Sequence, residues 1–264
     1  MKCALITGAS SGMGLEYARQ LAAMGYNIVA VSNDMEGNRR VAEELAQRYG
    51  IWAESLYADL SQPESAQQIY EKVTKRGLEV EILISNAGML LFSLLENTPE
   101  QNIEKIISLH CTTPTLLCRL FAHDMRRRGR GRILIMSSIT AWTPYPTISL
   151  YAATKVYLKN FGQSLWYEMR DSGVSVTTVF PSAVDTPFYT LNDRMRRRLR
   201  RWGLMMSAEQ VVRKAIRAMM HSRRRCLPGI MTKIEAGICA ILPACALLPI
   251  LKLKSVRKIL EGLS

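Results

Sequence analysis

Short apolar runs alternate with longer amphipathic segments through roughly the first two thirds of the chain. The apolar runs are rich in Val, Ile and Leu, which is typical of strands buried on both faces of a parallel sheet. We expect strands at 3–7, 27–32, 52–57, 81–85, 132–137 and 174–180. We expect helices at 12–24, 36–49, 63–76, 99–127 and 149–171. This alternation predicts an α/β fold, a single Rossmann-like doubly wound parallel sheet with helices on both faces and right-handed crossovers.

A glycine-rich turn follows the first expected strand. Gly8, Gly12 and Gly14 stand in Thr7-Gly-Ala-Ser-Ser-Gly-Met-Gly, and a helical pattern begins directly after them. Glycines at a strand-to-helix turn let the backbone approach a pyrophosphate, whose charge then lies at the helix N-terminus. Glycine turns without a ligand are also common, so the turn by itself does not establish a nucleotide site.

Ser138, Tyr151 and Lys155 have a spacing that suits hydride-transfer chemistry. Tyr151 and Lys155 are four residues apart, so a helix places them one turn apart on the same face. The Lys155 ammonium favours the phenolate and lowers a tyrosine pKa whose reference value is about 10. Ser138 ends an apolar run, and the carboxyl ends of such strands face the ligand crevice. For an isolated Tyr-x-x-x-Lys the alternative is a helical tyrosine with a solvated lysine, and the glycine turn favours the catalytic interpretation.

Further motifs occur in a fixed order, namely Asp59-Leu60, Ser85-Asn86-Ala87-Gly88 and Pro181-x-x-Val184-x-Thr186. With the glycine turn, Ser138 and Tyr151-x-x-x-Lys155, they resemble the short-chain dehydrogenase/reductase family over residues 1 to about 190. The pattern is most similar to the branch of lipid and steroid ketone reductases. The resemblance implies that Ser138 hydrogen-bonds a substrate carbonyl, that Tyr151 donates the proton, and that Lys155 lowers the tyrosine pKa and holds the nicotinamide ribose.

The resemblance also assigns the residues that would bind a dinucleotide. They are Gly8, Ser10, Ser11, Gly12, Met13 and Gly14 in the turn, Ser32, Asn33, Asp59, Leu60, Asn86, Ala87 and Gly88 after the next strands, and Tyr151, Lys155, Pro181, Val184 and Thr186 on the nicotinamide side. One departure from the family pattern is Pro181-Ser182, which replaces the usual Pro-Gly.

The end of the second strand decides between NADP and NAD. An acidic residue there would bind the ribose 2′-hydroxyl and repel a 2′-phosphate. Ser32 and Asn33 occupy this place, Asp34 stands one step beyond it, and Arg39-Arg40 follows. We therefore expect NADP(H), with NAD(H) as the alternative. We expect no bound metal, because the six cysteines show no paired metal-ligand spacing.

His110 is a second departure, at a position where the family usually carries an asparagine that holds a water in a proton relay to the lysine. An imidazole could pass a proton through water, which would make His110 a catalytic residue. It could equally be a core histidine with satisfied hydrogen bonds, and the sequence leaves both interpretations open.

The chain is basic, with a formal net charge of +13. Arginines form a first block at 126–132, a second at 194–201 and a third at 223–225. A solvated basic surface and a surface for an anionic membrane or substrate are both consistent with this pattern. We do not expect nucleic-acid binding, because no recognised nucleic-acid module accompanies the charge.

Two segments interrupt the pattern after the last expected strand. Residues 187–206 predict a basic lid over the substrate, before a helix that Ser207 caps. Residues 234–251 are nearly all apolar between basic flanks, which suits an element at a membrane interface. Packing over the substrate cleft or against a dimer partner explains this run equally well. We divide the chain into a catalytic domain at 1–232 and an extension at 233–264.

The sequence therefore predicts an NADP(H)-dependent oxidoreductase for a lipophilic ketone or secondary alcohol, such as a 3-keto-sphingoid base or a steroid. A 3-oxoacyl thioester reductase and a non-catalytic nucleotide-binding scaffold are the alternatives. We expect a cytoplasmic homo-oligomer, a dimer or a tetramer, which the C-terminal run attaches to the periphery of an anionic membrane if it does not pack on protein.

Overall fold

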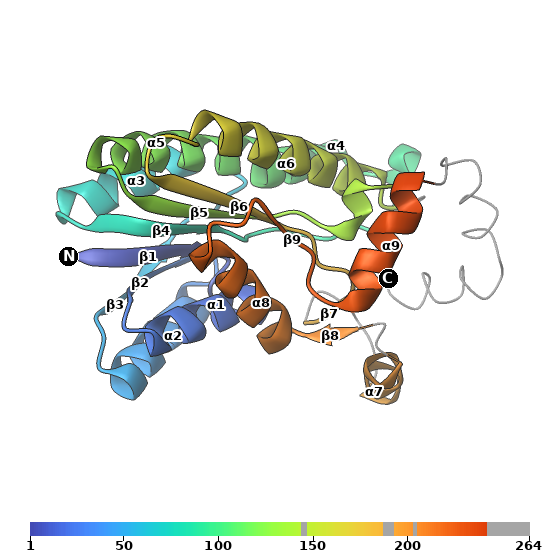
Figure 1. Cartoon of the computed structure of the whole chain (residues 1–264), viewed down its shortest axis with the longest axis horizontal. Coiled ribbons are helices and arrows are strands. Elements are labelled where there is room, and N and C mark those ends of the chain that lie inside the picture. Colours follow the sequence, from blue (N-terminus) through green and yellow to red (C-terminus); the bar gives the residue numbers. More distant parts are fainter. Residues whose placement is uncertain (144–146, 187–192, 203–204, 242–264) are drawn as a thin grey trace.

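A parallel sheet lies at the centre of the molecule and carries helices on both faces (Figure 1). The computed structural model describes residues 1–143, 147–186, 193–202 and 205–241. Within them the sheet has seven strands in the order β3-β2-β1-β4-β5-β6-β9. The strands are β1 (Lys2–Thr7), β2 (Asn27–Ser32), β3 (Ala53–Tyr57), β4 (Glu79–Ser85), β5 (Gly131–Met136), β6 (Val174–Val179) and β9 (Arg225–Cys226). All pairings between neighbours in this sheet are parallel, which confirms the predicted fold class.

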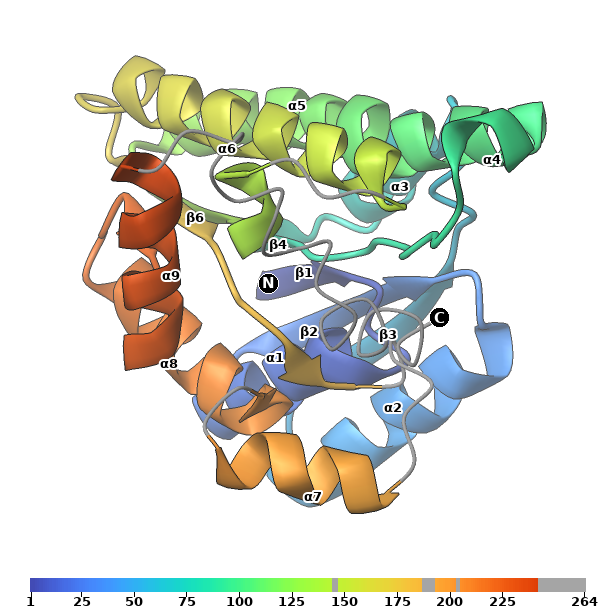
Figure 2. The ribbon, with the colours of Figure 1, turned by 90° about the vertical axis from the view of Figure 1, so that its right-hand side faces the viewer.

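Two layers of helices enclose the sheet (Figures 1 and 2). One layer contains α1 (Gly12–Ala23), α2 (Met35–Tyr49) and α8 (Ala208–Met220). The other contains α3 (Ser65–Lys75), α4 (Glu100–Ile107), α5 (Thr113–Arg128) and α6 (Ser149–Glu168). The expected strands and helices are present with boundaries shifted by a few residues. The one helix expected at 99–127 is divided into α4 and α5 by a π-helical turn at Ser108–Thr112.

The two faces of the sheet bury separate sets of apolar side chains. Along β1, Cys3 and Leu5 pack into the core on the side of α3 and α5, whereas Ala4 and Ile6 pack on the side of α1 and α8. Successive strand side chains point to opposite faces, so burial on both faces requires a continuous apolar run. Each fully buried leucine or isoleucine stabilises the fold by about 1.5–3 kcal/mol. This double burial explains the sequence pattern of the strands.

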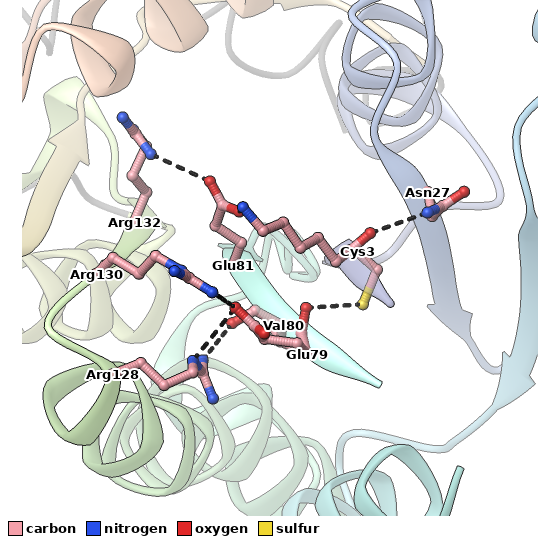
Figure 3. Close-up of polar contacts among 9 residues, drawn as sticks. Cys3, Asn27, Glu79, Val80, Glu81, Arg128, Arg130 and Arg132 are labelled. Atoms are coloured by element: carbon pink, nitrogen blue, oxygen red, sulfur yellow. Dashed lines mark hydrogen bonds and ion pairs between the residues drawn. The ribbon is translucent and has the colours of Figure 1, made fainter. Parts of the chain in front are cut away.

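Ion pairs join the amino-terminal ends of β1, β4 and β5 (Figure 3). Glu79 accepts a hydrogen bond from Arg130 Nη2 at 2.7 Å. Glu81 lies 3.5 Å from Lys2 Nζ and 3.6 Å from Arg132 Nη1. Part of the first arginine block is thus neutralised by the protein's own carboxylates, at the end of the sheet opposite to α9 (Figure 1). These ion pairs bridge the central strands β1, β4 and β5 at the end where the strands begin.

Two further helices, α7 (Asp193–Arg201) and α9 (Ile230–Ile241), lie near the carboxyl ends of the strands (Figure 1). Of the expected lid, 187–192 and 203–204 lie outside the described residues, and α7 forms part of the remainder. The short strands β7 (Val184–Asp185) and β8 (Met206–Ser207) pair with each other between α7 and the main sheet. Ser207 then caps α8 as expected, because its hydroxyl accepts from the Gln210 N–H.

The helix α9 carries the start of the apolar C-terminal run. It packs against a short 3-10 turn, η3 (Ile139–Ala141), and the expected domain boundary between 232 and 233 falls inside it. The extension is therefore continuous with the catalytic domain as far as 241, while 242–264 lie outside the described residues. Among the residues that are described, no helix combines the length and the apolar character that crossing a bilayer requires.

Gly162 tests the packing of α6 on the sheet. Replacing a mid-helix glycine by alanine normally stabilises a protein by about 1 kcal/mol. A Cβ on Gly162 would overlap Thr178 Oγ1 of β6, whereas a Cβ on Gly237 of α9 meets no atom within 4 Å. We expect Gly162→Ala to lower the free energy of unfolding by about 1–3 kcal/mol and Gly237→Ala to raise it slightly. Urea unfolding of both variants checks this, and equal stabilisation by both would contradict the close packing of α6 on β6.

Candidate active site

A cavity of about 790 Å³ opens at the carboxyl ends of the strands. Residues from the turns after six of the strands, together with α6 and α9, form its wall. The predicted site residues in this wall are Gly8, Ser10, Ser11, Gly12, Met13, Ser32, Asn33, Asp59, Leu60, Asn86, Ala87, Gly88, Ser138, Tyr151, Lys155, Pro181, Val184 and Thr186. Gly14 and His110 are also described, and they lie behind the wall rather than in it.

The glycine turn is shaped to receive an anionic group. Gly8 and Gly12 have positive φ angles of 69° and 54°, which favour glycine. A Cβ on Gly14 would overlap the Gly8 carbonyl oxygen, so Gly14 allows α1 to approach the end of β1. The N-cap residue Ser11 makes no side-chain capping bond, and the first turn of α1 holds no acidic residue. The turn therefore fits a pyrophosphate at an uncapped helix N-terminus.

Thr7, which the sequence motifs did not single out, holds the loop after β4 against this turn. Its Oγ1 accepts from the backbone N–H groups of Asn86 at 2.9 Å and Ala87 at 3.0 Å, and it donates to the Ile84 carbonyl at 3.3 Å. Asn86 Nδ2 in turn donates to the Thr7 carbonyl at 3.0 Å. In the sequence, the signal for this role is the threonine directly before Gly8. The hydrogen bonds of Thr7 place Asn86 and Gly88 in the cavity wall.

Lys155 is buried at the base of the cavity. Its Nζ donates to the Met136 carbonyl at 3.0 Å and lies 5.4 Å from the centroid of the Tyr151 ring. Ser137 Oγ donates to the Lys155 carbonyl at 2.8 Å, which ties α6 to the end of β5. Burial lowers the pKa of Lys155 from 10.5 to about 8, because the low-dielectric interior disfavours the ammonium.

Ser138 begins the η3 turn, where its Oγ accepts from the Thr140 N–H at 3.2 Å. The next residue, Ile139, donates its N–H to the Pro181 carbonyl at 3.0 Å. The loops after β5 and β6 are therefore bonded to each other. Ser138, Tyr151 and Pro181 consequently share one end of the cavity, as the motif order implied.

His110 lies in the π-helical turn and is fully buried. Its Nε2 accepts from the Met89 N–H at 2.9 Å, so its Nδ1 carries the proton and donates to Thr154 Oγ1 at 2.8 Å. Thr154 Oγ1 passes a hydrogen bond to the Tyr151 carbonyl at 2.9 Å. Burial holds the pKa of His110 well below its usual range. Both ring nitrogens are engaged by protein groups, which supports the core-histidine interpretation over a relay through water.

The end of β2 presents no carboxylate to the cavity. Ser32 and Asn33 form the wall, whereas Asp34 Oδ1 accepts from the Gly37 N–H and so caps α2. The guanidinium of Arg39 pairs with Glu36 at 2.7 Å, outside the cavity wall. The neutral strand end expected for NADP is present. Of the two arginines named as support for it, Arg39 pairs with Glu36, and neither Arg39 nor Arg40 belongs to the cavity wall.

The cavity wall also contains residues that the sequence did not single out. Met89, Leu90, Phe92 and Ile148 make the wall near Ser138 apolar. The side chain of Glu235 reaches the same wall from α9. This placement agrees with the alternative that the start of the run 234–251 packs over the substrate cleft, although the sequence did not single out Glu235.

Comparison with known proteins identifies the family. The family model for short chain dehydrogenases matches residues 2–196. The 17-beta-hydroxysteroid dehydrogenase type 3 of Mus musculus is 33% identical over 195 residues, which are 73% of this chain and 63% of that protein. The very-long-chain 3-oxoacyl-CoA reductase of Pyricularia oryzae is 35% identical over 181 residues, which are 67% of this chain and 54% of that protein. The chain thus spans somewhat more than half the length of these relatives.

Solved structures share the fold over nearly the whole chain. A short-chain dehydrogenase from Sphingobium yanoikuyae in complex with NADPH matches with a TM-score of 0.78 and 26% identity, covering 92% of this chain and 97% of that one. A 7beta-hydroxysteroid dehydrogenase matches with a TM-score of 0.85 at 21% identity, covering 94% and 96%, and supports the fold alone. The sequence family covers most of the chain, and its motifs are the ones that meet at the cavity. This chain therefore belongs to the short-chain dehydrogenase family.

Proposed function

We propose that the protein reduces a ketone of a lipophilic substrate with NADPH, or oxidises the corresponding secondary alcohol with NADP⁺. The observation that carries this proposal is the arrangement of one cavity. One end is the uncapped glycine turn, and the other end holds Ser138, Tyr151 and the buried Lys155. A nucleotide-binding end joined to a proton-donating end is what hydride transfer to a carbonyl requires.

Each polar group at the reacting end has a separate task. Ser138 Oγ binds and orients the carbonyl oxygen, and the Tyr151 phenol donates a proton to that oxygen. Lys155 favours the phenolate form and binds the nicotinamide ribose. His110 is assigned a positioning role, because its ring links Met89 in the cavity wall to Thr154 beside Lys155. The bound cofactor supplies the hydride.

The cofactor assignment to NADP(H) rests on the end of β2. Ser32 and Asn33 leave room for a 2′-phosphate, and the nearest carboxylate, Asp34, is engaged in capping α2. The NADPH in the Sphingobium yanoikuyae relative supports the same choice.

The apolar wall near Ser138 supports a lipophilic substrate such as a 3-keto-sphingoid base or a steroid. The names of the hydroxysteroid dehydrogenase relatives point in the same direction. A 3-oxoacyl thioester reductase is the second candidate, and the 35% identity to a very-long-chain 3-oxoacyl-CoA reductase favours it. A non-catalytic scaffold would not need the Ser138, Tyr151 and Lys155 constellation.

Peripheral attachment to an anionic membrane is part of this proposal. The helix α9 exposes Ile230, Ile234 and Ile238, which recur every four residues along one stripe. The second arginine block lies in α7, at the same end of the molecule (Figure 1). Buried apolar side chains and basic groups together give reversible binding at a lipid surface. Assembly into a dimer or tetramer and a cytoplasmic location stay predictions from the sequence.

The phenol of Tyr151 is tested by Tyr151→Phe. We expect kcat/KM to fall by about 100- to 10,000-fold, the usual contribution of a general acid, while NADPH affinity measured by fluorescence titration stays nearly unchanged. Tyr157→Phe is the matched control, because Tyr157 lies on the same helix with its ring exposed. Substantial activity of Tyr151→Phe at any pH would refute the assignment.

Cofactor preference is tested at Ser32. The native protein should show a higher kcat/KM with NADPH than with NADH. Ser32→Asp should reverse this preference, because a carboxylate accepts from the 2′-hydroxyl and repels the 2′-phosphate. Asp34→Asn is the control, since the side chain of Asp34 caps α2. If the native protein prefers NADH and Asp34→Asn abolishes that preference, Asp34 rather than Ser32 reads the ribose.

Membrane attachment is tested by sedimentation with phosphatidylserine vesicles. We expect the native chain to sediment and the double variant Ile234→Glu, Ile238→Glu to remain in the supernatant. Met24→Glu is the control, because Met24 is equally exposed in the turn after α1, away from α9. Failure of the native chain to sediment would show that the isoleucine stripe serves another purpose.

A further inference from the structure

The third arginine block, at 223–225, differs from the other two in its counter-charges. The first block forms ion pairs with two glutamates of β4, and the second forms them with Asp185 of β7. The third block ends in β9, which is the outermost strand on its side of the sheet (Figure 1). In the part of the chain that the structure describes, Arg223, Arg224 and Arg225 form no ion pair with a carboxylate.

Further cations surround the same strand. Lys214 of α8 and Lys233 of α9 both act electrostatically on the Cys226 thiol of β9, as Arg223 does. Burial lowers the pKa of Lys159 in α6, and repulsion from Arg225 lowers it further. We call this set the basic β9 edge, and its members are Lys159, Lys214, Arg223, Arg224, Arg225 and Lys233. None of the six is paired with an acid of the described chain, so like charges accumulate here without an internal counter-charge.

The end of α6 holds two of the guanidinium groups in place. The Cζ of Arg224 lies 5.4 Å from the centroid of the Trp166 ring, and its Nη1 donates to the Tyr167 hydroxyl at 3.1 Å. Arg225 Nη2 donates to Gln163 Oε1. A guanidinium has five N–H donors, so each of these groups is oriented and still has donors to offer. Side chains that are held in this way lose less conformational entropy when a partner binds.

We propose that the basic β9 edge binds an acidic segment of a partner protein. The proposal goes beyond ketone reduction and does not depend on it. The planar fork of an arginine matches a carboxylate with two parallel hydrogen bonds, which suits successive Asp and Glu side chains. The cations come from α6, α8, α9 and the chain that enters β9, so a small anion would meet only some of them. No described strand pairs with the outer side of β9, which leaves its backbone open to an extended segment.

The same geometry disfavours other partners. Single-stranded nucleic acid stacks its bases on open aromatic rings, whereas Trp166 packs against the core and faces Arg224. A second copy of the chain would set cations against cations across a twofold axis. A flat lipid surface at the carboxyl ends of the strands would meet α9, but α6 runs from that end back along the sheet (Figure 1). Most of the basic β9 edge would then lie away from the lipid.

The test measures binding of a fluorescently labelled octaglutamate peptide to the full chain by anisotropy. We expect Arg224→Gln, Arg225→Gln to weaken binding by about 10-fold, because charge-assisted hydrogen bonds are lost. The charge-matched control is Arg40→Gln, Arg119→Gln, which removes two exposed arginines from α2 and α5. The control should weaken binding by less than about twofold, since distant exposed charges are screened. Octaglutamine should not bind to the native chain.

A second variant separates charge from packing. Arg224 packs on aromatic rings, so its replacement also removes contacts within the fold. Lys214 and Lys233 are exposed, and we expect Lys214→Gln, Lys233→Gln to weaken octaglutamate binding by about three- to 10-fold with an unchanged midpoint of thermal unfolding.

Several results would overturn the proposal. One is an absence of octaglutamate binding by the native chain. Another is equal weakening in the control and in both edge variants, which would mean that only net charge attracts the peptide. The same assays with a single-stranded DNA oligonucleotide and with phosphatidylserine vesicles test the other partners. If the edge variants lose binding to either of these while they retain octaglutamate binding, the edge serves nucleic acid or lipid instead.

Discussion

The close approach of α1 to the end of β1 is the constraint on which the site depends. Gly14 faces the Gly8 carbonyl oxygen with no room for a Cβ, and the Asn86 side chain lies beside both glycines. Thr7 bonds the loop after β4 to the same turn. Two loops that are far apart in the chain are thereby fixed as one surface. The helix N-terminus and Asn86 can face a nucleotide together because no side chain separates them.

Burial of Lys155 costs free energy of folding but places its ammonium beside Tyr151. Burial disfavours the ammonium of Lys155 and lowers its pKa to about 8, and the Met136 carbonyl is a partial replacement for water. The positive charge is then close to the Tyr151 ring and poorly screened. A buried lysine by itself destabilises the fold. Here its charge lies where the phenol of Tyr151 and a bound ribose would interact with it.

The distribution of charge separates a structural end of the molecule from a functional one. Arg130 and Arg132 are paired with Glu79 and Glu81 where the strands begin, so these charges link the central strands β4 and β5 (Figure 3). The arginines of α7 and the exposed isoleucines of α9 lie where the strands end and the cavity opens (Figure 1). In the proposed peripheral attachment, a lipophilic substrate would reach the cavity from the lipid side.

The sequence by itself determined what depends on local spacing. Strands buried on both faces need continuous apolar runs, the glycine turn has a fixed backbone requirement, and one helical turn joins Tyr151 to Lys155, so these features were predicted correctly. Tertiary structure decided what depends on partners distant in the chain. The proton position on His110 follows from Met89 and Thr154, and Glu235 enters the wall only because α9 packs on η3. Periodicity reports which face of an element is buried, but it carries no information on which distant group meets a given side chain.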